Sequence, residues 1–162
     1  MNREERLEKI DQYGRGHDLL AQSLAGIPRA AWEFKPAPNE WSIHEVLIHM
    51  ADSEMMGVIR LGKLVAEPGS TLMTYEEDAW SSSMNYRDQD VDDALQLFRL
   101  LRQKTYRLLR ALPDDVWSHG LIHPLQDEPY ALDQWLGIYT DHVHEHTEQA
   151  RSIHQAWLAE KG

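Results

Sequence analysis

Four long segments with helical periodicity constrain the fold of this chain more than any other feature. In each segment apolar residues recur at every third or fourth position, which is the pattern of a helix with one buried face. The segments cover residues 2–26, 42–67, 91–112 and 131–160. Prolines, which disfavour helix, stand between them at Pro28, Pro36, Pro38, Pro68 and Pro113. The pattern predicts an all-α fold, a four-helix bundle, with residues 1–162 forming a single domain.

Two of the connections between these helices are long, at residues 69–90 and 113–130. Connections of this length in compact domains are often functional or disordered. We expect a short helix around Glu76–Trp80 in the first and no regular element in the second. The second long helix has a clear start, because Ser42 is followed three residues later by Glu45, the spacing of a capping box.

Two local features refine the expected bundle. Gly14 and Gly16 are poor helix formers in the middle of the first segment, and they indicate a kink or the close approach of a neighbouring helix. The third segment has a basic flank, which we interpret as a solvated face. Its members are Arg99, Arg102, Lys104, Arg107 and Arg110.

Composition narrows the possible chemistry and location. The chain has no cysteine, so any metal must be held by His, Asp or Glu. A formal charge of −11 and the lack of a basic stripe argue against binding to nucleic acid. The charged N-terminus is unlike a signal peptide, and no apolar run approaches the ~20 residues of a membrane span. We therefore expect a soluble, cytoplasmic protein that does not associate with membranes.

A histidine pair in the last helical segment is the strongest candidate for a functional site. His142 and His146 are four residues apart, so they lie on one face of a helix and continue its apolar stripe. His144 points elsewhere. In the second segment, His49 neighbours Val46 and Met50 at helical spacing and belongs near the buried face. A pair plus one inward histidine would form a three-histidine centre.

Three neutral imidazoles leave an open coordination position, as in a catalytic zinc site, although Ni(II), Fe(II) and Co(II) also suit imidazole. Three hydrogen-bonded structural histidines without a metal are the alternative. His44, in the first turn of its helix, is expected to be exposed. His17, a lone histidine on the first helix, is interpreted as a surface or core-edge residue, and the spacing of His119 and His123 in a loop gives no reason to assign them as ligands.

At two segments the sequence resembles the DinB/YfiT-like family. They are residues 41–49 (WSIHEVLIH) and 139–149 (YTDHVHEHTEQ), the second matching the family's His-x3-His-x2-Gln pattern. The resemblance implies a four-helix bundle with an unusual helix connection, a divalent metal bound by His49, His142 and His146, and a homodimer. It also implies metal-dependent chemistry of low-molecular-weight thiols such as bacillithiol or mycothiol. Thr147 and Glu148 depart from the residues common in the family, so no substrate preference carries over.

The leading hypothesis is a metal-dependent enzyme, a hydrolase or thiol S-transferase, in which zinc, nickel or iron activates water or an external thiol toward a small-molecule substrate. The alternative is a non-catalytic metal-binding or stress-response scaffold. Asp52 and Gln149, each three residues beyond a candidate ligand, are candidates for accepting a hydrogen bond from the second ring nitrogen of a ligand histidine, and surface or packing positions are the alternative. The aromatic residues Trp41, Trp80 and Tyr139 are candidates for lining the access to the site.

Overall fold

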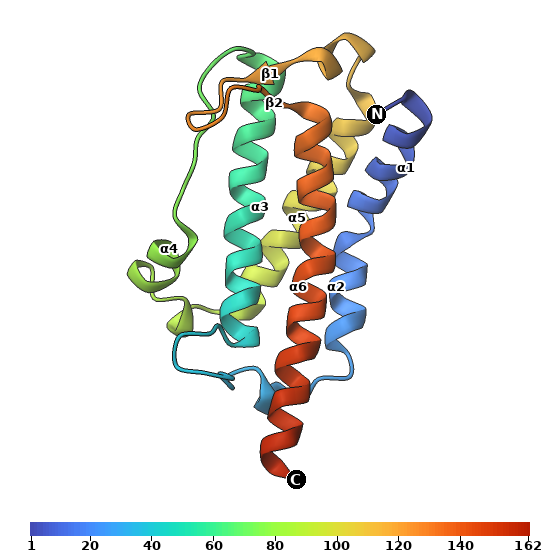
Figure 1. Ribbon diagram of the computed structural model, residues 1–162. Coiled ribbons are helices and arrows are strands. Elements are labelled where there is room, and N and C mark those ends of the chain that lie inside the picture. The colour runs from blue at the N-terminus through green and yellow to red at the C-terminus, as the bar shows by residue number, and fades with distance from the viewer.

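The computed structural model describes residues 1–162 and shows long helices standing side by side (Figure 1). The bundle consists of α1 (Arg3–Gly14) continued by α2 (Gly16–Leu24), α3 (Ile43–Ala66), α5 (Val91–Ala111) and α6 (Leu132–Lys161). Helix α3 packs against α5 and α6, and α1 and α2 pack against the same two helices from the other side. The predicted all-α, four-helix bundle is confirmed.

The two long connections contain short elements. The first holds α4 (Glu77–Ser83), close to the expected short helix, and a 3₁₀ turn, η2 (Tyr86–Asp88). The second holds η3 (Asp114–Ser118) and two antiparallel strands, β1 (Gly120–Leu121) and β2 (Tyr130–Ala131). We predicted no regular element there, because strands of two residues are too short to show an alternating pattern. A further 3₁₀ turn, η1 (Arg29–Ala31), precedes α3.

The first predicted helix is broken at Arg15, between the two glycines that the sequence pointed to. A Cβ atom on Gly14 would lie 2.6 Å from the Tyr106 ring, and one on Gly16 would lie 2.5 Å from the Arg102 guanidinium. Both contacts come from α5, so a side chain at either glycine would have to displace the Tyr106 ring or the Arg102 guanidinium. The expected kink and the expected close approach both occur here.

Arg102 corrects the prediction that the basic flank of α5 is solvated throughout. Its side chain is only 1% exposed, and it forms an ion pair of 2.8 Å with the equally buried Glu54 of α3. It also donates hydrogen bonds to the carbonyl oxygens of Tyr13 and Tyr139. Helical spacing placed Arg102 correctly on α5 but could not show that α1, α3 and α6 surround it with acceptors.

The start of α3 confirms the predicted capping box. The Ser42 hydroxyl accepts a hydrogen bond from the Glu45 backbone N–H, and the Glu45 carboxylate accepts one from the Ser42 N–H. This first turn is buried, and so His44 is 8% exposed and not solvated as we expected. The His44 backbone N–H donates to the carbonyl of Trp32 in the preceding loop, which covers the turn.

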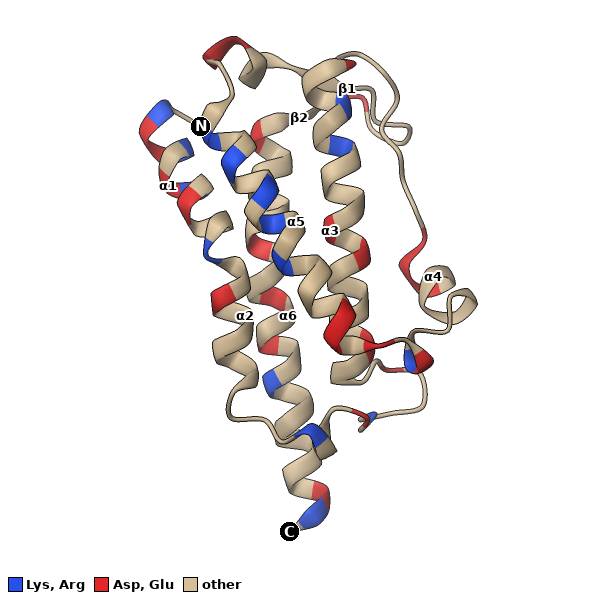
Figure 2. Cartoon of the chain, turned by 180° about the vertical axis from the view of Figure 1, so that it is seen from behind, with Lys and Arg blue, Asp and Glu red and all other residues tan.

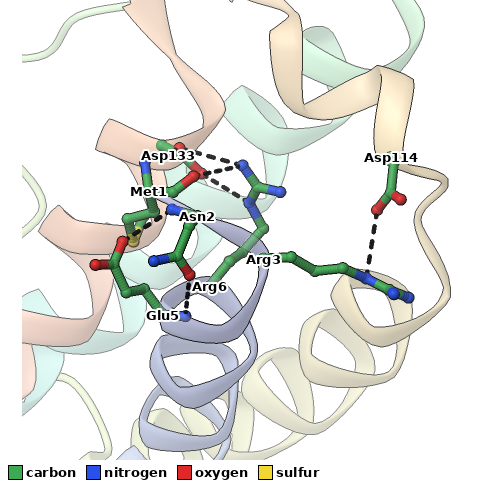
Figure 3. Close-up of polar contacts among 7 residues, drawn as sticks. All are labelled: Met1, Asn2, Arg3, Glu5, Arg6, Asp114 and Asp133. Atoms are coloured by element: carbon green, nitrogen blue, oxygen red, sulfur yellow. Dashed lines mark hydrogen bonds and ion pairs between the residues drawn. The ribbon is translucent and has the colours of Figure 1, made fainter.

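Polar contacts attach the N-terminus to the start of α6 (Figure 3). The terminal amine and the Arg6 guanidinium both donate to Asp133, at 2.7 and 2.9 Å. Asn2 caps α1 in a reciprocal arrangement with Glu5. These contacts fix α1 against α6 at the end of the bundle that is remote from the chain's C-terminus.

Charge is distributed unevenly over the bundle (Figure 2). Basic positions recur along α5, and acidic positions gather at α4 and at the turn into α5. None of the helices combines the length and the apolar character needed to cross a membrane.

Candidate metal centre

Three histidine rings from two helices meet inside the bundle. His49 lies in the second turn of α3, and His142 and His146 lie one turn apart on α6. The Nε2 atom of His142 is 3.2 Å from that of His49 and 2.9 Å from that of His146. The structure therefore brings together the three histidines that the sequence singled out.

The spacing of these nitrogens matches the ligand shell of one metal ion. Nitrogen ligands about 2.0–2.1 Å from a tetrahedral zinc ion lie about 3.3 Å from one another. The coordinating atoms of His49, His142 and His146 all lie within 4.8 Å of one another, and no other group of three potential ligands in the chain converges in this way.

Burial keeps the three rings neutral, which is the form that binds metal. Burial, together with a smaller effect of the neighbouring His146, lowers the pKa of His49 to about 3. Burial likewise lowers the pKa of His142 to about 2, with smaller contributions from His146, His49 and Arg102. The pKa of His146 is also lowered by burial. Each of the three rings thus has one nitrogen with a free lone pair at neutral pH.

Hydrogen bonds between the rings cannot satisfy all three nitrogens. A neutral imidazole Nε2 is either one donor or one acceptor, yet the Nε2 of His142 faces two others. The Nδ1 atom of His49 is buried and has no partner of its own. A cation among the three Nε2 atoms would use every lone pair, so the donor set fits a divalent metal.

Of the two residues that the sequence suggested as hydrogen-bond partners of the histidines, Gln149 contacts a ring and Asp52 does not. Gln149 Oε1 lies 2.7 Å from His146 Nδ1, which places the ring proton on Nδ1 and directs the Nε2 lone pair to the centre. Asp52 accepts a hydrogen bond of 2.7 Å from the Tyr86 hydroxyl, and no hydrogen bond joins it to His49. Tyr86, in η2, is a neighbour that helical spacing could not have found.

Comparison with known proteins agrees with this geometry. A family model described as the DinB superfamily matches residues 12–150. This chain belongs to the DinB superfamily.

Among its relatives, YfiT of Bacillus subtilis, named a "putative metal-dependent hydrolase", is 33% identical over 106 residues, which is 65% of this chain and 60% of that protein. A Bacillus licheniformis protein with the same description is 27% identical over 144 residues, covering 88% of this chain and 82% of that protein. The solved structure of YfiT, described as "a probable metal-dependent hydrolase with an unusual four-helix bundle topology", is 25% identical. It superposes with a TM-score of 0.86 over 94% of this chain and 87% of that one.

The other histidines of this DinB-superfamily chain stay outside the centre. His144, between the two α6 histidines, lines a surface hollow beside α1 and α2. His17 lies beside Asp18, His119 beside the carbonyl of Leu64, and His123 accepts from the backbone of Leu125. Helical periodicity placed His144 correctly on another face of α6.

Of the three aromatic residues considered for the access, Trp41 lies closest to the histidines. Its ring centroid is 4.8 Å from that of His49. Trp80 packs against Tyr75, and the Tyr139 hydroxyl accepts a hydrogen bond from Arg60. Only the Trp41 ring is in contact with the centre.

Proposed function

We propose that this protein is a divalent-metal-dependent hydrolase, with His49, His142 and His146 as the metal ligands. The observation that carries the proposal is the convergence of three neutral Nε2 atoms, with neighbouring pairs 3.2 and 2.9 Å apart. The names of its relatives support the same reaction class. Zinc, nickel and iron are the candidate ions, since imidazole suits each.

When bound, such an ion would lower the pKa of a bound water and polarise the carbonyl group next to the bond that is hydrolysed. The chain itself keeps the three donors neutral and oriented. Gln149 holds the His146 ring in the tautomer whose Nε2 lone pair faces the centre. Trp41 packs on His49, which is completely buried, and keeps water away from that ring.

Asp52 is the candidate for proton transfer. It follows His49 by one turn on the same face of α3, and burial raises the pKa of its carboxyl. A carboxyl with a raised pKa is suited to exchange protons with a substrate that comes within its reach. The hydrogen bond from Tyr86 fixes its orientation.

Transfer of a low-molecular-weight thiol is the second candidate. The chain has no cysteine, so a thiol nucleophile would have to come from solution to the open coordination position. A thiol bound at that position would be deprotonated by the metal, and the two reactions differ in the substrate that reaches the centre.

Activity assays on protein purified without a histidine tag test the proposal. We expect hydrolysis of p-nitrophenyl esters or of small amides that stops on chelation and returns with added metal. His142→Ala should abolish it, and His144→Ala, on the same helix, should not. Chelator-sensitive conjugation of monochlorobimane to added thiols, without hydrolysis, would favour thiol transfer. Metal binding without either activity would indicate the non-catalytic scaffold.

A further inference from the structure

Helices α3 and α5, which pack side by side, share an exposed apolar face. It consists of residues at helical spacing: Met55, Val58, Ile59 and Gly62 of α3 with Leu97, Leu100, Leu101 and Leu108 of α5. We call this surface the outer face. Four of its larger side chains are 40–54% exposed, namely Ile59, Leu97, Leu100 and Leu108. Exposed apolar side chains that gather in this way mark an interaction surface.

No segment of the folded chain covers the outer face. Figure 2 shows the molecule from this side, with α3 beside α5. The connection that carries α4 runs along the far edge of α3 in this view and does not cross α5. The three histidines lie elsewhere, between α3 and α6. The outer face is therefore open to a partner and separate from the metal centre.

Two opposite charges of α5 are placed symmetrically about Leu100. Asp93 precedes Leu100 by seven residues and Arg107 follows it by seven, so each lies about 10 Å from it on the same side of the helix. Both side chains are exposed, and neither belongs to an ion pair of the structure. A second copy of α5, antiparallel and centred on Leu100, would place its Arg107 opposite Asp93 and its Asp93 opposite Arg107. The helix is therefore complementary in charge to its own copy.

A hollow between the N-terminal halves of α3 and α5 fits the same arrangement. Its volume is about 410 Å³, and its apolar lining consists of Ile48, Ala51, Ala94 and Leu97. Leu108 follows Leu97 by eleven residues, close to three full turns, so it lies on the same side of α5. In the antiparallel copy Leu108 is level with Asp92, next to this hollow, which Asp93 also lines. Each copy thus presents an exposed leucine to the hollow of the other, with Arg107 beside an acidic residue.

We propose that two copies of this chain associate through the outer face, with α5 of one copy antiparallel to α5 of the other and the twofold axis at Leu100. The same axis brings α3 of each copy opposite α3 of the other, so one surface is used twice. Leucines form the centre of this interface, and the Asp93–Arg107 pairs lie toward its rim. The inference is independent of the proposed function, because no metal ligand belongs to the outer face.

Disulfide trapping tests the position of the axis. The chain has no cysteine, so a single introduced cysteine can form a disulfide only with its own copy in a second molecule. We expect Leu100→Cys to form a covalent dimer on mild oxidation, because a residue on the axis meets itself within the reach of a disulfide. Leu7→Cys, at an exposed apolar position of α1, is the control and should stay monomeric. Equal yields of covalent dimer from both variants would overturn the inference.

A mixture of two variants tests the antiparallel register. The two copies of residue 93 lie about 20 Å apart in this arrangement, so neither Asp93→Cys nor Arg107→Cys should cross-link by itself. Mixed in equal amounts, the two variants should form a disulfide with each other, which mass spectrometry distinguishes from a dimer of either one. Absence of the mixed product would overturn the antiparallel arrangement.

Charge reversal tests the complementarity in solution, with the dimer dissociation constant measured by sedimentation velocity. We expect Asp93→Arg and Arg107→Asp each to weaken the dimer about tenfold, because each places like charges together at two symmetric sites. Asp93→Arg/Arg107→Asp restores both pairs and should return to within about twofold of the wild type. The single reversals change the net charge in opposite directions, so a general charge effect cannot weaken both. Glu8→Arg, at an exposed position of α1, is the control and should not weaken the dimer.

A charge at the axis tests the apolar contact. Leu100→Glu should sediment as a monomer with unchanged circular dichroism and thermal midpoint, since the leucine side chain is 54% exposed. Leu158→Glu, 45% exposed near the end of α6, should remain dimeric. A wild type that sediments as a monomer at every protein concentration would overturn the inference, and so would single reversals that the double variant does not restore.

Discussion

His142 is the residue of the centre whose Nε2 atom lies beside both other histidines. Its Nε2 faces two other imidazole nitrogens, and burial lowers its pKa to about 2. The folded state therefore disfavours a proton on this ring, whereas the unfolded chain accepts one at the usual histidine pKa. In the absence of metal, such a ring makes the folded state sensitive to acid.

The sign of this pH dependence follows from the lowered pKa. The stability that His142 supports is complete above about pH 6.5 and is lost as the pH falls toward about 2, because the unfolded chain binds the extra proton. We expect the metal-free wild type to lose about 2 kcal/mol more than His142→Gln between pH 7 and pH 5. Urea unfolding at both pH values, with chelator present, measures the difference. Equal losses in the two proteins would contradict it.

Gln149 contributes to metal affinity through the hydrogen bond to His146. Replacing it with leucine removes the acceptor that fixes the ring, and loss of such a partner typically weakens metal binding about 10–100-fold. Gln149→Glu retains an acceptor and should bind at least as tightly as the wild type. Gln155→Leu, at an exposed position of α6, is the control. Competition with a chromophoric chelator gives the affinities, and a Gln149→Leu protein that matches the control would rule out this role.

At the scale of the helices, Gly57 sets the distance between α3 and α6. A Cβ atom there would lie 2.6 Å from the Tyr139 ring, and the Gly57 carbonyl accepts a hydrogen bond from the Trp135 indole. Gly62 lies on the same helix, and a Cβ atom there would meet no neighbouring atom within 4 Å. Gly62 is therefore the matched control for a substitution at Gly57.

We expect Gly57→Ala to lower the free energy of unfolding by about 1–3 kcal/mol, because it overpacks the contact between the two helices that carry the histidines. Gly62→Ala should raise it by roughly 0.5–1 kcal/mol, since alanine is the better helix former. Denaturant titration of both variants decides the matter. A Gly57→Ala protein as stable as Gly62→Ala would show that the helices can move apart without cost.

The sequence predicted the positions of the helices better than the burial and the partners of individual side chains. Periodicity and the capping box located α3 and α6, and the i, i+4 rule placed His142 and His146 together, because these are local properties of a helix. His44 and Arg102 were expected to be exposed and are buried, because their environment comes from segments distant in the chain. Tyr86, the partner of Asp52, lies in a connection whose path no periodicity describes.

At the scale of the whole molecule, one buried ion pair links most of the bundle. Arg102 of α5 pairs with Glu54 of α3 and donates to carbonyl oxygens of α1 and α6, while the Tyr13 hydroxyl donates to Glu54. Apolar clusters lie on either side along the bundle, one including Leu47 and the other Leu64. The polar group between them fixes how the helices are aligned along their length.

A double-mutant cycle tests this linkage. Glu54→Leu leaves a buried guanidinium without its counter-ion and should cost about 3–5 kcal/mol of unfolding free energy. In Glu54→Leu/Arg102→Met no charge remains, so the cost should be well below the sum of the two single variants. Chemical denaturation of the four proteins gives the coupling energy. Additive costs would show that the pair contributes no coupling.

The most direct test of the metal centre is a crystal structure of tag-free protein, grown without added metal, with anomalous diffraction collected at the absorption edges of zinc, nickel and iron. We expect a single anomalous peak about 2.0–2.1 Å from the Nε2 atoms of His49, His142 and His146. A peak bound by other residues, or three rings joined only by hydrogen bonds and water with no anomalous signal, would contradict the proposed centre.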